Sequence, residues 1–238
     1  MKTISYINYF FYLAWNWNIS IAWKILKEEI KGEKKFGINT TGADELKKLE
    51  ALGIDTSHAT IYMPVSYQLL EEIFAQLERP ESKPKPQAGP DHFIDIGCGK
   101  GRALCVAAHH GFTKLTGVDL SREFCDQAKE NLAITKQQFP ELEYDIINND
   151  AFYFEIPPDA NYIFLFNPFD EVIMSGVLNM LFSSLHKYPR EFSLVYVNPL
   201  HKKLFLNAGF KETWYSKKMK YLEVSILTGR LYVSTFRL

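Results

Sequence analysis

The clearest fold signal in the chain is His92-Phe-Ile-Asp-Ile-Gly-Cys-Gly-Lys-Gly-Arg102. An apolar run from Phe93 to Ile96 predicts a strand, which leads into a turn with three glycines in five residues. A helical pattern follows, and a second apolar run ends on the acid Asp119. Glycines let a backbone approach a ligand closely, and an acid at the tip of the next strand is placed to bind ribose hydroxyls. The stretch therefore predicts a β-loop-α-β nucleotide-binding unit.

The spacing of the glycines separates two kinds of nucleotide site. Dinucleotide sites use Gly-x-Gly-x-x-Gly to hold a pyrophosphate, whereas Gly97, Gly99 and Gly101 are spaced Gly-x-Gly-x-Gly and Arg102 replaces the third dinucleotide glycine. Asp95 would repel a pyrophosphate but suits a ligand with positive charge, such as S-adenosylmethionine (SAM), which has an ammonium and a sulfonium group. An NAD-dependent oxidoreductase and a turn without ligand stay open as alternatives. Three neighbouring glycines cost conformational entropy, however, which argues against a turn without a ligand.

Asp95-x-Gly97-x-Gly99-x-Gly101 resembles motif I of the class I (seven-strand, Rossmann-like) SAM-dependent methyltransferases. The resemblance covers residues 57–200 and is nearest to an uncharacterised bacterial branch of that class. It implies SAM as cofactor, Asp119 as the acid that binds its ribose, and Asp150-Ala151 beside its adenine ring. The expected cofactor-binding residues are Tyr62, Asp95, Gly97, Cys98, Gly99, Gly101, Asp119, Leu120, Asp150 and Ala151. Lys100 and Arg102 are expected either to meet the SAM carboxylate or to lie in solvent.

The sequence Asn167-Pro168-Phe169 follows a fully apolar run, Tyr162 to Phe166, which predicts a central parallel strand. It resembles, with one proline fewer, the Asn-Pro-Pro-Tyr/Phe motif of class I enzymes that methylate amines and amides. The resemblance implies that Asn167, Pro168 and Phe169 are catalytic, because the Asn oxygen and a proline carbonyl would accept hydrogen bonds from the target nitrogen. A proline turn without chemistry is the alternative. Ligands bind at the ends of strands in α/β folds, which favours the catalytic interpretation.

Tyr62-Met-Pro-Val-Ser66 distantly resembles a Tyr-x-Pro-x-Ser element of the seven-strand protein-lysine methyltransferases. The resemblance implies a lid over SAM, and a turn that starts a helix is the alternative. We therefore expect methyl transfer to a nitrogen of an unidentified acceptor, with a protein lysine among the candidates. A non-catalytic SAM-binding or scaffold protein of the same fold, and a methyltransferase acting on RNA or a small molecule, remain alternatives.

Hydrophobic periodicity predicts a helical N-terminal extension (1–80), a proline-rich linker (81–90) and an α/β core (91–238). The core is expected to be a Rossmann-like seven-stranded sheet with helices on both faces and an antiparallel C-terminal hairpin. Helices are predicted over 3–31 with Gly32 as C-cap, over 45–52, from Ser66 to Pro80, from Ser121 to Phe139, over 171–187 and over 201–208. The later strands are predicted over 144–148, 192–197, 221–227 and 231–236, with Thr228-Gly229 as the hairpin turn.

Charge and composition limit the partners. The net charge of −1 gives no general attraction to nucleic acid or membrane. Residues 91–169 carry 12 acids against 6 bases, which argues against a large nucleic-acid groove and favours a protein or small-molecule acceptor. Residues 170–238 carry 5 acids against 10 bases, which indicates either a solvated face or a patch for an anionic substrate. Three scattered cysteines and six histidines form no metal-ligand pattern, so we expect no metal and a reducing cytoplasm.

The first 30 residues are rich in aromatic side chains but contain no run long enough to span a bilayer. We expect helices that pack on the core or on a second subunit, which would give a homodimer. Shallow attachment to a membrane surface is the alternative.

Overall fold

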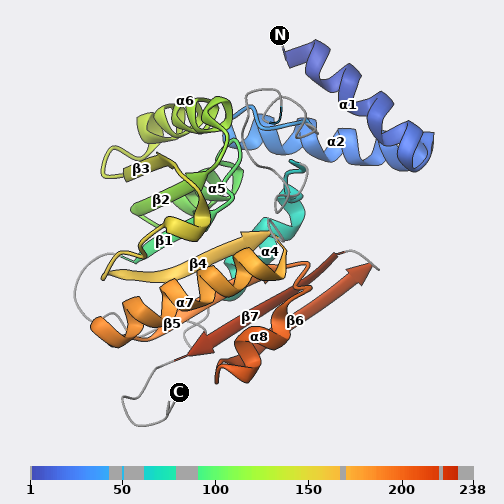
Figure 1. Cartoon of the computed structure of the whole chain (residues 1–238). Coiled ribbons are helices and arrows are strands. Elements are labelled where there is room, and N and C mark those ends of the chain that lie inside the picture. Colours follow the sequence, from blue (N-terminus) through green and yellow to red (C-terminus); the bar gives the residue numbers. More distant parts are fainter. Residues whose placement is uncertain are drawn as a thin grey trace.

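The computed structural model describes residues 2–42, 50, 62–78, 91–166, 170–219 and 222–229. Its centre is a seven-stranded sheet in the order β3-β2-β1-β4-β5-β7-β6 (Figure 1). The strands are β1 (His92–Ile96), β2 (Lys114–Asp119), β3 (Glu143–Asn148), β4 (Ala160–Phe166), β5 (Phe192–Val197), β6 (Lys211–Met219) and β7 (Leu222–Gly229). Strands β1 to β5 are parallel, and β7 runs antiparallel between β5 and β6. The predicted Rossmann-like fold is confirmed.

Helices cover both faces of the sheet, and the N-terminal helices form an extension of the domain (Figure 1). They are α1 (Lys2–Asn16), α2 (Ile19–Phe36), α4 (Tyr67–Leu77), α5 (Arg102–His109), α6 (Arg122–Gln138), α7 (Glu171–Lys187) and α8 (Lys202–Asn207), with a short 3-10 turn, η2 (Ala151–Tyr153). No helix within the described residues is long and apolar enough to cross a membrane.

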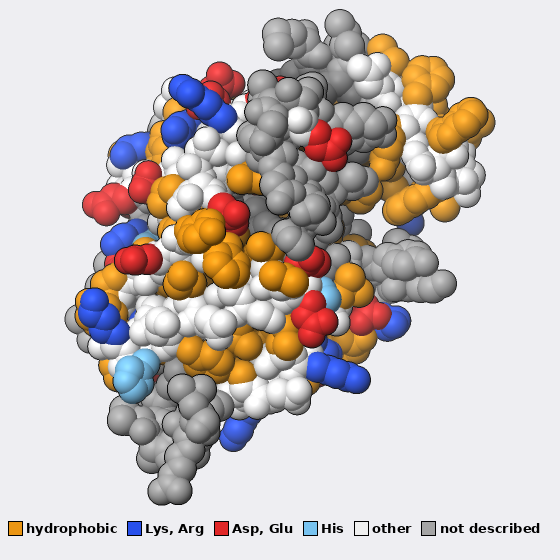
Figure 2. Space-filling model, in the orientation of Figure 1, with side chains coloured by type: hydrophobic (Ala, Val, Ile, Leu, Met, Phe, Trp, Pro, Cys, Tyr) orange, Lys and Arg blue, Asp and Glu red, His pale blue; other side chains and the backbone are white. Residues whose placement is uncertain are grey.

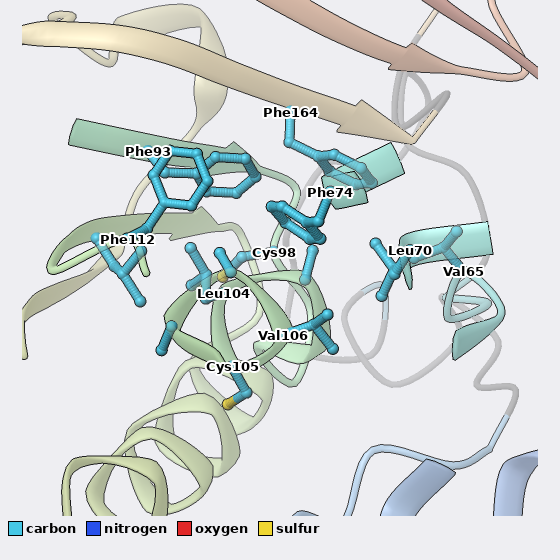
Figure 3. Packing of buried hydrophobic residues seen from close by; sticks show 14 of the residues in the cluster. Val65, Leu70, Phe74, Phe93, Cys98, Leu104, Cys105, Val106, Phe112 and Phe164 are labelled. Atoms are coloured by element: carbon cyan, nitrogen blue, oxygen red, sulfur yellow. The ribbon is translucent and has the colours of Figure 1, made fainter. Parts of the chain in front are cut away.

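Alternating residues of the central strands supply two separate apolar cores. Phe93 belongs to the core with α4, α5 and α6, whereas Ile94 belongs to the core with α7 and α8. Phe74 of α4 lies near the sheet, with its ring centroid 5.5 Å from that of Phe93 (Figure 3). The helix that precedes the glycine loop in sequence is therefore part of the main core, where burial of apolar area stabilises it.

Side-chain caps fix where three helices begin. Ser66 accepts a hydrogen bond from the backbone of Leu69, and Ser121 caps α6 in the same way through Phe124. Asp170 caps α7 by accepting from the backbone nitrogens of the second and third helical residues. Such caps satisfy amide groups that have no partner inside the helix, which is why these starts were visible in the sequence.

Gly32 does not end the second helix, contrary to the prediction. Helix α2 continues to Phe36, and Gly37, in the left-handed conformation with φ of 72°, is its C-cap. Gly32 is instead a point of close approach, because a Cβ there would lie 2.0 Å from the ring of Tyr67.

The predicted hairpin turn at Thr228-Gly229 is also wrong. Both residues lie inside β7, where Thr228 pairs with Lys211 of β6 and Gly229 pairs with Phe192 of β5. Glycine is needed there for packing, since a Cβ would lie 2.8 Å from the ring of Phe210. The hairpin instead joins β6 to β7. The predicted strand over 231–236, most of the predicted helix over 45–52 and the linker over 81–90 lie outside the described residues.

Candidate active site

The glycine loop between β1 and α5 has the backbone that its sequence requires. Gly97, Gly99 and Gly101 have φ angles of 81°, 52° and 79°, a region that residues with a Cβ rarely adopt. The amide groups of Gly97 and Cys98 both donate to the carbonyl of Val118, at 2.8 and 3.0 Å. The loop is therefore fixed against the end of β2.

Asp119, the last residue of β2, holds the loop through its side chain. One carboxylate oxygen accepts from the backbone nitrogen of Gly99 at 2.7 Å, and the other accepts from that of Ser121 at 2.9 Å. Burial raises the pKa of Asp119, and the two backbone hydrogen bonds oppose that rise. Each carboxylate oxygen keeps further acceptor capacity, so Asp119 could also accept from ribose hydroxyls.

Asp95 is a second buried acid near Asp119, on the neighbouring strand β1. Only 4% of its surface is exposed, and no described residue forms a hydrogen bond with its carboxylate. Burial, with the negative charge of Asp119 as the second cause, raises the pKa of Asp95 well above its ordinary value. A buried carboxyl without a partner is costly, and a cationic ligand is the chemistry that would offset the cost.

Arg102 does not lie in solvent, contrary to one of the two options predicted. Its guanidinium is buried and forms a two-pronged ion pair with Glu29 of α2, one contact of which is 2.9 Å long. It also donates to the hydroxyl of Thr40 at 2.7 Å and to the carbonyl of Val65 at 2.9 Å. Arg102 therefore links helix α2 to the start of α5, directly after the glycine loop. Sequence analysis missed Glu29, because nothing local marks a glutamate whose partner is 73 residues away.

Tyr62 lies directly against the glycine loop. Its hydroxyl donates to the carbonyl of Thr40 at 2.7 Å, and its ring occupies the space beside Gly99, where a Cβ would approach it to 2.3 Å. The ring centroid is 4.6 Å from that of Phe124, and the ammonium of Lys100 lies 5.1 Å from it. Tyr62 is thus positioned next to the predicted cofactor site.

Four further predicted residues lie at the same edge of the sheet. Cys98 is buried in the loop, and the carbonyl of Leu120 accepts from the side chain of Asn148 at 2.8 Å. Asp150 follows β3 and caps η2 by accepting from the backbone of Phe152 at 2.9 Å, and Ala151 is buried. Asn167, Pro168 and Phe169 lie outside the described residues. No group of metal ligands occurs among the residues that the structure describes.

The fold is Rossmann-like, and comparison with known proteins narrows the class of its central domain. Residues 94–194 match the sequence family described as a methyltransferase domain. A presumed O-methyltransferase from Nostoc punctiforme has a similar structure, with a TM-score of 0.52 and 16% identity over 68% of this chain and 56% of that one. No curated protein sequence matches the chain.

Two further similar structures contain the cofactor or its product. An RNA methyltransferase from Salinibacter ruber in complex with S-adenosyl-L-homocysteine gives a TM-score of 0.48 and 15% identity, over 70% of this chain and 93% of that one. Magnesium protoporphyrin IX methyltransferase from Synechocystis, with bound SAM, gives a TM-score of 0.47 and 15% identity, over 68% of this chain and 78% of that one.

Residues 94–194 thus match a methyltransferase domain, and they lie within a seven-stranded Rossmann-like sheet. The residues present fit SAM. The buried Asp95 matches a cationic group, and Asp119 keeps acceptor capacity for ribose hydroxyls.

Proposed function

We propose that this methyltransferase transfers the methyl group of SAM to a nitrogen of an amine or amide, with a protein lysine as one candidate acceptor. The observation that carries the proposal is the placement of Asn167-Pro168-Phe169 in the chain, directly after β4. Leu165 of β4 pairs with Ile96, the last residue of β1, and the next residue, Phe166, ends β4. Strand β4 therefore ends beside the end of β1, at the edge of the sheet where α/β proteins bind ligands, and Asn167 is the next residue in the chain.

The cofactor residues have separate proposed roles. Asp95 would face the ammonium of SAM, the loop backbone would approach its methionine part, and Asp119 would accept from its ribose hydroxyls. Asp150 and Ala151 would lie beside the adenine ring, with Tyr62 covering the loop at Gly99. The family resemblance implies these roles, and the charge and position of the groups at the ends of β1, β2 and β3 support them.

When bound, SAM supplies an electrophilic methyl group on a good leaving group, so the protein's task is to position the nucleophile and to exclude water. The side-chain oxygen of Asn167 would accept a hydrogen bond from the target nitrogen and direct its lone pair. Phe169 would pack against the acceptor. A lysine acceptor must lose its proton first, since its free pKa is about 10.4, and an apolar pocket favours the neutral amine.

Titration calorimetry with SAM and turnover with radiolabelled SAM test the proposal together. Asp119→Ala should weaken SAM binding at least about tenfold, because it removes the acceptor for Gly99 as well as for ribose. Asn167→Ala and Phe169→Ala should leave SAM binding nearly unchanged and should reduce methyl transfer.

The acceptor is identified by incubating the enzyme and labelled SAM with lysate divided into protein, RNA and metabolite fractions. Label on a protein or metabolite nitrogen, lost with Asn167→Ala, supports the proposal. Label on oxygen or carbon, or on RNA alone, would overturn the acceptor assignment. SAM binding without any transfer would indicate a non-catalytic SAM-binding protein.

A further inference from the structure

The helical hairpin formed by α1 and α2 (Lys2–Phe36) exposes an unusual amount of apolar surface. Trp15 is 91% exposed, which is unusual for so large an apolar side chain. The other exposed large apolar residues at this end are Ile7, Phe11, Trp17, Ile19, Ile21 and Trp23. Figure 2 shows apolar side chains gathered over the end of the molecule where Figure 1 places α1 and the start of α2.

These side chains form one surface that spans both helices. Ile7, Phe11 and Trp15 are spaced four residues apart, so they share one face of α1. The ring of Phe10 contacts both Phe11 and Trp23, at centroid distances of 5.8 and 5.7 Å, and so links the two helices. The other side of α1 is already used, because Tyr9 and Leu13 are buried against Ala22 of α2.

The outer face of α2 is basic. Lys24, Lys27, Lys31 and Lys34 are exposed, and none of them forms an ion pair with a described residue. Glu28 is the exposed acid of α2, since Glu29 and Glu33 are buried on the side that faces the core. The apolar and basic groups adjoin each other, as the ammonium of Lys27 lies 5.7 Å from the ring centroid of Trp23.

We propose that the α1–α2 hairpin binds the surface of an anionic membrane. Tryptophans prefer the boundary between headgroups and acyl chains, and neighbouring lysines are attracted to anionic headgroups. The contact would be shallow, because no described helix could span the bilayer. A second copy of the chain is the weaker occupant, since a two-fold contact through this face would bring the lysines of both copies together.

Vesicle cosedimentation of the full chain tests the proposal. We expect binding to phosphatidylcholine vesicles that contain phosphatidylglycerol, and little binding to phosphatidylcholine alone. Binding should fall sharply at about 1 M salt, where the Debye length is only about 3 Å. Failure to bind the anionic vesicles at low salt, or equal binding to both kinds, would overturn the proposal.

Two double variants separate the apolar from the electrostatic part. Trp15→Ser with Trp17→Ser should reduce binding about tenfold or more, because it removes the side chains expected to enter the interface. Lys27→Gln with Lys31→Gln should reduce it about 25-fold, at about fivefold per lysine. Circular dichroism should show both variants folded, since all four side chains are exposed.

The matched controls lie elsewhere on the surface. Tyr188→Ser removes an exposed aromatic residue after α7, and Lys129→Gln with Lys136→Gln removes two exposed lysines of α6. Neither control should change vesicle binding, and an equal loss in the controls would count against the hairpin as the docking surface. Light scattering without vesicles supplies the last test. A dimer that Trp15→Ser with Trp17→Ser dissociates would assign the surface to a second copy and overturn the membrane proposal.

Discussion

The glycine loop and the α1–α2 hairpin depart from ordinary burial in opposite directions. Around the loop, the charged groups of Asp95, Asp119 and Arg102 are largely withdrawn from water. On the hairpin, large apolar groups such as Trp15 are exposed to it. Neither arrangement serves stability alone, because buried charge and exposed aromatic surface are both unfavourable without a partner.

The difference teaches where the partners lie. Arg102 has its partner inside the chain, in Glu29, whereas no described residue pairs with Asp95, and the aromatic face of the hairpin has no described covering. An internal partner indicates a structural role, whereas the proposals above assign Asp95 and the aromatic face to partners outside the chain. The four variants below test this distinction, from the largest expected effect to the smallest.

Arg102→Met should have the largest effect, a loss of about 3 kcal/mol or more in the free energy of unfolding, because it leaves Glu29 buried and unpaired. Urea denaturation measures this loss. Glu29→Met combined with Arg102→Met should recover much of it, since an apolar pair can replace a buried ion pair. A single variant as stable as the unchanged protein would show that the ion pair does not hold α2 to the core.

Gly99→Ala should weaken SAM binding at least about tenfold, because it combines backbone strain with a contact that must displace Tyr62. Gly111→Ala is the matched control, since Gly111 has φ of 87° and nothing within 4 Å of a Cβ. Calorimetry with SAM should show normal binding for the control. Similar losses in both variants would mean that the contact with Tyr62 is irrelevant.

Asp95→Asn should stabilise the cofactor-free protein at neutral pH by about 1–2 kcal/mol and weaken SAM binding. Because the pKa of Asp95 is raised on folding, its stabilising contribution is complete below its ordinary pKa of 3.8 and is lost as pH rises through the raised pKa. Denaturation of the unchanged protein between pH 4 and 8 should therefore show this loss, and the variant should show less of it.

Asp145→Asn is the control for this change, because Asp145 is an exposed acid of β3. It should alter neither the pH dependence nor SAM binding. If Asp95→Asn binds SAM as tightly as the unchanged protein, Asp95 does not pair with the ammonium.

Trp15→Ser should have the smallest effect, within about 0.5 kcal/mol of the original free energy of unfolding, since the side chain is 91% exposed. Thermal denaturation measured by circular dichroism provides the value. A large loss would place Trp15 in a structural contact and remove it from the docking surface.

Much of the fold was predictable because its signals are local. The apolar run of each element, and the residues that begin or end it, are close together in the sequence. Both α7 and β5 have their predicted bounds. The acids and glycines at the ends of β1 and β2 were equally visible, as their spacing reflects the turn that they form. Their roles in binding remain predictions.

The errors arose where distant groups determine the structure. Gly32 was predicted to be a helix cap and Gly229 to be part of a turn. Glycine is needed at these positions because the rings of Tyr67 and Phe210 pack against them, and the sequence does not reveal those contacts. The option that Arg102 lies in solvent was wrong for the same reason, because its partner Glu29 belongs to another helix.

The pairing of Glu29 with Arg102 also bears on how the chain folds during synthesis. Translation produces the glutamate first, and the arginine follows 73 residues later, after α4 and β1 have been made. Until then α2 lacks the arginine that pairs with its buried Glu29, so we expect that it does not pack stably before Arg102 is made. We expect nascent chains that end before Arg102 to leave α2 loosely held and open to proteases.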